Sequence, residues 1–285
     1  MPPLPRVYAY RDERSMGPTR WSPRLTVCTL TENHNDLPGK LYVAKFCQGA
    51  HGAAAMISEV VCRELFRAGG LHVLDAVVVE ASETFAGSWN KTNEGEKPIV
   101  AGSYFGTAYV PDPYGGSVDS LEQVESPQHL ALIWLLDCLV CNIDREIRGN
   151  LMLLPRGPSL KLRVLPADNS DCFCGSLAFS NGQWRDLMRR RGPASGILVL
   201  PAIAAIGGEI GLRIAMQTVR AALDSIGGSF DQVPPEWWVA ASIQPEQVEE
   251  TLWERMDALP ELINVAQWTG GFTDGDINGI PLIQL

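Results

Sequence analysis

The chain has 285 residues and a mass of 31.1 kDa, enough for one large domain or two small ones. Its 33 acidic and 23 basic side chains give a net charge of -10 and a pI near 4.9, which argues against nonspecific binding to a nucleic-acid backbone. The longest apolar runs, 130–141 and 196–206, are shorter than the ~20 residues that a membrane span needs. We therefore expect a soluble cytoplasmic protein that binds neither membranes nor nucleic acid directly.

Cysteine and lysine usage are both informative. The seven cysteines are scattered and odd in number, whereas a secreted disulfide framework is normally short, dense and even, so we expect reduced thiols. Lysine supplies only five of the 23 basic side chains, so a lysine inside a predicted strand is unusual for this chain. The five are Lys40, Lys45, Lys91, Lys97 and Lys161.

The N-terminal segment is rich in proline and charge and lacks sustained periodicity, so we expect residues 1–35 to form an irregular arm. Turn residues at 35–39 follow it. The segment 41–46, Leu-Tyr-Val-Ala-Lys-Phe, then has the composition of a strand. Lys45 stands at the end of this predicted strand.

The next segments alternate between helix and strand patterns. Apolar residues spaced three and four apart predict a helix over 56–67, which a pair of glycines ends, and 71–80 has the pattern of a buried strand. Polar residues at 82–98 predict a loop, and 99–110 is another extended segment. Prolines and glycines at 111–116 then mark a boundary between lobes.

Strand patterns are frequent before this boundary and helix patterns dominate after it, which predicts an α+β protein. Residues 36–112 form the expected small, β-rich N-terminal lobe, and residues 113–285 the larger, mostly helical C-terminal lobe. A helix is predicted to begin at Ser126 and Pro127, the residue order that helix starts prefer. Its segment 130–136 is apolar on all sides, which places this helix at the centre of the C-terminal lobe.

A predicted hairpin follows this helix, with strands over 151–154 and 160–165. Antiparallel pairing places the start of the first strand beside the end of the second, so Asn150 and Asp168 should converge near Asp144. Two oxygen ligands beside a further carboxylate suit Mg²⁺ together with substrate phosphates. Phosphoryl transfer is therefore the leading hypothesis, with the strand-end lysine available to cancel phosphate charge.

Several motifs occur in one order along the chain. They are Tyr42-Val43-Ala44-Lys45-Phe46, Ser58-Glu59-Val60-Val61, Gly69-Gly70-Leu71, Cys141-Asn142-Ile143-Asp144-Arg145-Glu146 with Asn150-Leu151, Ala167-Asp168-Asn169-Ser170, and Val233-Pro234-Pro235-Glu236-Trp237-Trp238. Their order and spacing resemble the HipA-like kinase family over roughly residues 37–262.

The resemblance implies a protein-kinase-like bilobal fold that binds ATP between its lobes and transfers the terminal phosphate to a Ser or Thr hydroxyl. In that reading Lys45 contacts the ATP phosphates and Glu59 holds Lys45. Asp144 is the catalytic aspartate, and Asn150 and Asp168 ligate Mg²⁺. Each of these roles is an expectation from the resemblance.

Two of these assignments have rivals within the sequence. Glu64 falls on the apolar stripe of its predicted helix, whereas Glu59 lies beside the stripe, and either could pair with a buried lysine. Asp171, three residues beyond Asp168, is a competing metal ligand.

The function also has alternatives. No regular GxGxxG loop precedes Lys45, which leaves open a catalytically weak or inactive nucleotide-binding pseudokinase that acts as an interaction module. The Asp144-Arg145 loop also resembles that of phosphoinositide kinases, although no basic stripe suited to anionic lipids is evident. For a HipA-like kinase the resemblance implies an unidentified protein substrate, and it suggests a small antitoxin-like partner.

Other motifs have simpler interpretations. Cys138, Cys141, Cys172 and Cys174 could be imagined as a zinc site, but the first pair lies within a helix pattern, so buried thiols are favoured. Residues 274–279 resemble half of an EF-hand loop without its bidentate Glu and indicate a polar turn. Arginines 189–191 indicate a solvated helix end. Further helices are predicted over 210–226 and 245–259.

Overall fold

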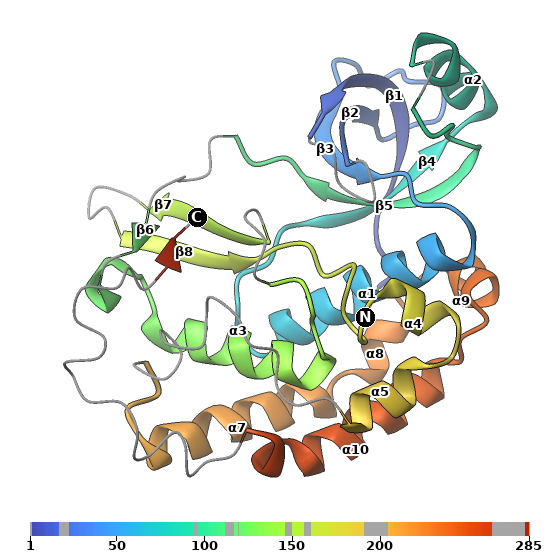
Figure 1. Cartoon of the computed structure of the whole chain (residues 1–285). Helices are drawn as coiled ribbons and strands as arrows, with labels where there is room; N and C mark the ends of the chain where they lie inside the picture. The colour runs from blue at the N-terminus through green and yellow to red at the C-terminus, as the bar shows by residue number, and fades with distance from the viewer. Residues whose placement is uncertain are drawn as a thin grey trace.

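Five strands close into a small barrel in the N-terminal region (Figure 1). The computed structural model describes residues 2–16, 23–93, 96–111, 117–118, 120–145, 150–156, 161–190, 205–263 and 283–284. The barrel order is β1-β2-β3-β5-β4, and a parallel pair between β1 and β4 closes it. The strands are β1 (Arg6–Ser15), β2 (Arg24–Thr29), β3 (Lys40–Lys45), β4 (Ala76–Ala81) and β5 (Gly102–Ala108). The expected β-rich N-terminal region is present, and its strands form a closed barrel.

The first two strands correct the expectation of an irregular arm over residues 1–35. β1 and β2 pair with each other, and every residue of β2 is buried between β1 and β3. The pairing register of β1 shifts between Ala9 and Arg11 and again between Asp12 and Arg14. Such irregularities interrupt the alternation of inward and outward side chains, so β1 carries no clean period of two in its sequence.

A second correction concerns the expected loop over 82–98, which contains helix α2 (Glu83–Thr92). The Ser82 side chain caps its start by accepting a hydrogen bond from the Phe85 backbone N–H at 3.1 Å. Phe85 and Trp89, four residues apart, place buried rings on the same face of the helix. One helix face is therefore apolar although the segment as a whole is polar.

Helix α1 (Gly49–Ala68) connects the barrel to the helical part of the molecule. It begins seven residues earlier than the sequence pattern predicted, and most of its side chains are buried. The later helices that it packs against include α3 (Pro127–Val140), α4 (Ser176–Ser180) and α9 (Pro235–Ala241). A single hydrophobic core extends from the barrel through α1 into these helices.

Helix α3 is the central helix that the sequence predicted. Ser126 and Pro127 stand at its start, and the residues from Leu130 through Val140 are all buried. The predicted hairpin is also present: β7 (Leu151–Arg156) pairs with β8 (Lys161–Pro166), with Leu151 opposite Pro166. The remaining elements are β6 (Ser117–Val118), the short 3-10 helix η1 (Leu121–Gln123), α5 (Trp184–Arg190), α7 (Glu209–Asp224), α8 (Gly227–Phe230), α10 (Pro245–Leu262) and β9 (Ile283–Gln284).

Two sequence predictions fall on residues outside the described ranges, the polar turn at 274–279 and most of the lobe boundary at 111–116. Arginine 191 lies outside them as well, whereas Arg189 pairs with Glu254 of α10 at 2.8 Å. Among the described helices none combines the length and apolar character that crossing a bilayer requires.

The start of α1 provides a sharp test of this packing. A Cβ added at Gly52 would lie 2.5 Å from the carbonyl carbon of Cys47, whereas one added at Gly87 in α2 meets nothing within 4 Å. We predict that Gly52→Ala destabilises the protein by about 1–3 kcal/mol, because the helix must shift. Gly87→Ala should stabilise it by up to about 1 kcal/mol through helix propensity. Urea unfolding of both variants measures the difference, and equal effects would contradict the packing described here.

Candidate active site

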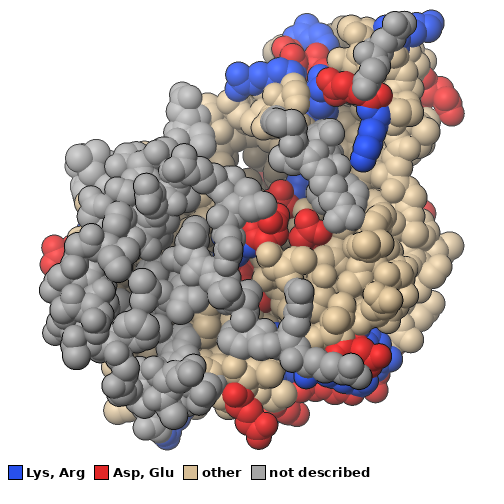
Figure 2. Space-filling model, in the orientation of Figure 1, with Lys and Arg blue, Asp and Glu red and all other residues tan. Residues whose placement is uncertain are grey.

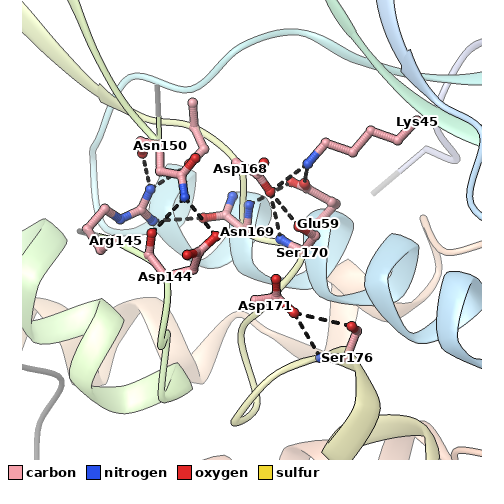
Figure 3. Close-up of polar contacts among 11 residues, drawn as sticks. Lys45, Glu59, Asp144, Arg145, Asn150, Asp168, Asn169, Ser170, Asp171 and Ser176 are labelled. Carbon is pink, nitrogen blue, oxygen red and sulfur yellow. Dashed lines mark hydrogen bonds and ion pairs between the residues drawn. The ribbon is translucent and has the colours of Figure 1, made fainter. Parts of the chain in front are cut away.

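The ammonium group of Lys45 lies at the meeting point of three parts of the chain (Figure 3). Lys45 ends β3 and is only 8% exposed. Its Nζ donates to the Glu59 carboxylate of α1 and, at 2.6 Å, to Oδ1 of Asp168, which follows β8. The Glu59 carboxylate also accepts a bond from the Asn169 backbone N–H at 3.1 Å. The structure therefore brings together three of the predicted site residues from distant parts of the sequence.

These three groups set one another's protonation. Burial alone would lower the pKa of Lys45, but the carboxylates of Asp168 and Glu59 more than offset it and hold that pKa above its usual range. Burial would raise the pKa of Asp168, but Lys45 and the Ser170 hydroxyl hold it well below its usual value. Lys45 and Asp168 are therefore both charged at neutral pH.

Asp144 and Asn150 form a second group beside the first. The Asn150 Nδ2 donates to the Asp144 backbone carbonyl at 2.6 Å and to its Oδ2 at 3.0 Å. The Asn142 Oδ1 accepts a hydrogen bond from the Asp144 backbone N–H at 2.9 Å. Both the N–H and the carbonyl of Asp144 are therefore held by asparagine side chains. Partial burial raises the pKa of Asp144, and the nearby carboxylates of Asp171 and Asp168 raise it further.

Arg145 joins the two groups, and sequence reasoning assigned it no role. Its guanidinium makes paired hydrogen bonds to Asp137 of α3 at 2.8 and 3.0 Å and a third to Asn169 Oδ1 at 2.9 Å. It also donates to the backbone carbonyls of Asn150 and Ala167. A signal for it was present in the sequence, since Asp137 interrupts an all-apolar helix and a buried carboxylate needs a cation.

The rival carboxylates have other partners. Glu64 accepts hydrogen bonds from Arg63 and, at 2.7 Å, from Arg67 Nε. The carboxylate of α1 that contacts Lys45 is therefore Glu59 and not Glu64. Asp171 Oδ1 accepts from the backbone N–H and the hydroxyl of Ser176, each at 3.2 Å. Asp168, and not Asp171, makes the contact with Lys45.

A cavity of about 560 Å³ opens over these residues, between the barrel and the hairpin. Figure 2 shows acidic side chains gathered in the hollow between the two parts of the molecule. Met16 and Pro23, at the facing ends of β1 and β2, also line the cavity, so the misread N-terminal segment contributes to the site. The described residues that line the cavity are Arg14, Met16, Pro23, Val43, Lys45, Glu59, Arg63, Val73, Leu74, Phe105, Thr107, Ala108, Tyr109, Val110, Asn150, Met152, Pro166, Ala167, Asp168 and Asn169.

The donor set at the cavity floor fits a hard divalent cation such as Mg²⁺. From the described residues no hydrogen bond reaches Oδ2 of Asp168 or Oδ1 of Asn150, which leaves one carboxylate and one amide oxygen available. Lys45 lies between the carboxyl groups of Glu59, whose pKa burial raises, and Asp168, and Asp144 adds a further carboxyl group nearby. Two oxygen ligands in an acidic setting suit Mg²⁺, which completes its shell with water and phosphate.

The four cysteines considered as a zinc site are buried and form no disulfide bond, and buried thiols are what the sequence favoured. Within the described ranges no group of three or more His, Cys, Asp and Glu side chains has the arrangement of a metal site.

No protein-family profile and no curated protein matches the chain. Among solved structures it is similar to the crystal structure of a Helicobacter pylori proinflammatory kinase, CtkA. The similarity has a TM-score of 0.53 at 12% sequence identity and covers 93% of this chain and 97% of that one. The chain therefore has a kinase-like fold.

Removing the central arginine should damage the protein severely. We predict that Arg145→Met lowers the free energy of unfolding by about 3–5 kcal/mol, because it leaves Asp137 as an unpaired buried charge. Arg163→Met, which breaks a more exposed pair with Glu125, is the matched control and should cost at most about 1 kcal/mol. Urea unfolding at pH 7 compares them, and a similar cost for both would contradict the anchoring role of Arg145.

Asp168 should make stability depend on pH. Its folded pKa is lowered below the unfolded value of about 3.9, so its contribution is complete above that value and is lost as pH falls toward the folded pKa. The difference in unfolding free energy between the wild type and Asp168→Asn should therefore be constant from pH 6 to 8 and shrink below about pH 4. Denaturant titrations across this range measure it, and a difference that grows toward acid would contradict the pairing with Lys45.

Proposed function

We propose that the chain is an ATP- and Mg²⁺-dependent kinase of the HipA-like family, which transfers the terminal phosphate of ATP to a Ser or Thr hydroxyl of a protein. The observation that carries this proposal is the contact of Lys45 with both Glu59 and Asp168 on the floor of the cavity, with Asp144 and Asn150 alongside. The kinase-like fold supports phosphoryl transfer in general terms. The family and the acceptor class rest on the sequence motifs.

Phosphoryl transfer requires little covalent chemistry from the protein, because its transition state is loose and catalysis consists mainly of positioning and charge compensation. Lys45 is suited to binding phosphate oxygens, since its two carboxylate partners keep it protonated. Glu59, itself held by the Asn169 backbone, fixes the direction of the lysine from α1. Bound Mg²⁺, held by Asn150 and Asp168, would neutralise charge on the phosphates.

Asp144 is the residue proposed to receive the proton of the acceptor hydroxyl. Its backbone N–H and carbonyl bond to Asn142 and Asn150, which fixes the loop that presents its carboxylate. The raised pKa of Asp144 makes this carboxylate a stronger base than an ordinary exposed aspartate. Since Asn150 bonds to Asp144 and lies beside Asp168, the base and the proposed cation site are held at a fixed spacing.

The proposal is tested with labelled ATP. Wild-type protein with Mg²⁺ should transfer label to itself or to a protein of a cell extract, and EDTA should stop the transfer. Asp144→Asn should reduce transfer by about 10²- to 10⁴-fold while ATP and Mg²⁺ still raise its melting temperature. Asp257→Asn, which alters an exposed ion pair with Arg220, is the control and should retain full transfer.

Two outcomes would contradict the proposal. Normal transfer by Asp144→Asn would remove the role given to that residue. Stabilisation of the wild type by ATP and Mg²⁺ without transfer to any protein would instead favour the nucleotide-binding module that does not catalyse.

A further inference from the structure

Two thiols face each other on the segments that carry the candidate active-site residues. The Cys174 thiol donates to the Cys141 sulfur, and the Sγ atoms are 3.1 Å apart. The backbones are also joined, since the Cys174 N–H donates to the Cys141 carbonyl at 3.1 Å. The preceding N–H, that of Phe173, donates to the Val140 carbonyl at 2.7 Å. Hydrogen-bonded backbones and facing sulfur atoms are the arrangement from which a disulfide can form without large movement.

The pair connects the two loops that carry the candidate catalytic groups. Cys141 ends α3 and stands three residues before Asp144, and Cys174 stands six residues after Asp168. Both cysteines have left-handed backbone conformations, with φ of 49° and 65°. Non-glycine residues rarely adopt this conformation, and surrounding contacts must hold them in it. A covalent link here would act on both loops of the site.

We propose that Cys141 and Cys174 are a modification site that forms a reversible disulfide, with a low-molecular-weight disulfide such as oxidised glutathione as the oxidant. We assign the first attack to Cys174 because this residue is 7% exposed, against 2% for Cys141. Its thiolate breaks the glutathione S–S bond, forms a mixed disulfide and releases one glutathione. The Cys141 sulfur then displaces the second glutathione and closes the Cys141–Cys174 bond. The two protein thiols are oxidised, and their hydrogens leave on two reduced glutathione molecules.

The consequence for catalysis rests on the proposed kinase function. A disulfide bond is about 2.05 Å long, so the two sulfur atoms must approach by about 1 Å, and the part of this approach that side-chain rotation does not supply moves the loops that carry Asp144 and Asp168. Catalytic groups tolerate displacements of only about 0.5 Å, and an error of about 1 Å can cost 10²-fold in rate. Oxidation should therefore slow phosphoryl transfer, and reduction should restore it.

The chain offers a second thiol pair as an internal control. Cys62 of α1 and Cys172 also interact, but neither is exposed at all. The Cys62–Cys172 pair therefore lacks the access that Cys174 provides. Cys62→Ser leaves both members of the proposed disulfide in place.

The experiment equilibrates the full-length protein in buffers of increasing oxidised-to-reduced glutathione ratio. Free thiols are then blocked with N-ethylmaleimide, and the cross-linked peptides are identified by mass spectrometry. We expect a Cys141–Cys174 link in oxidising buffer, and phosphoryl transfer should fall by roughly 10- to 100-fold and recover on addition of dithiothreitol. Cys174→Ala should keep its activity in the same buffer, whereas Cys62→Ser should still form the link and lose activity.

Absence of the link at every glutathione ratio in the wild type would overturn the proposal, whether or not the variants fold. A link that leaves transfer unchanged would overturn the proposed control of catalysis. Detection of the link requires no activity, so a protein that forms the link but never transfers phosphate would support the disulfide and contradict the kinase function alone.

Discussion

The site depends on the burial of one ammonium group between two carboxylates. Lys45 comes from the barrel, Glu59 from α1 and Asp168 from the segment after the hairpin, so their contact fixes the relative position of three elements. A buried charge that loses its partner is strongly destabilising, so none of the three groups can be withdrawn alone without cost. Within the described residues Oδ2 of Asp168 and Oδ1 of Asn150 accept no hydrogen bond, so oxygen atoms remain available beside this ammonium group. The cavity floor that this interaction orders is therefore also suited to a cation.

A second buried ion pair, between Arg145 and Asp137, positions residues next to the first. Arg145 binds Asp137 of α3 and also Asn169, the neighbour of Asp168. The central helix therefore helps to position both the loop that carries Asp144 and the segment that carries Asp168. Away from these loops, the Trp237 Nε1 of α9 donates to the Ser103 carbonyl of β5 at 3.2 Å. Helix α9 thus contacts both α1 and the barrel. The long helix that carries Glu59 is therefore held by α9 as well as by its contact with Lys45.

Local sequence patterns predicted much of this arrangement. They showed the strand that ends at Lys45, the capped and all-apolar helix α3, and the hairpin. Hairpin geometry alone places Asn150 near Asp168. The misread parts depend on distant partners. β1 and β2 become strands by closing the barrel, and the irregular register of β1 hides its alternation. The sequence signals that Asp137 needs a cation, but only the folded chain shows that Arg145 is that cation.

The most direct test of the proposed nucleotide site uses an ATP analogue with an acyl group on its terminal phosphate, which acylates lysines in contact with the bound nucleotide. The chain has five lysines, and among them Lys45 lines the cavity. We predict that mass spectrometry will find the acyl group on Lys45, and that excess ATP with Mg²⁺ will prevent the labelling. Excess ATP should not reduce any labelling of the other four lysines, Lys40, Lys91, Lys97 and Lys161. An unlabelled Lys45, or labelling that ATP does not reduce, would contradict a nucleotide site formed around this ammonium group.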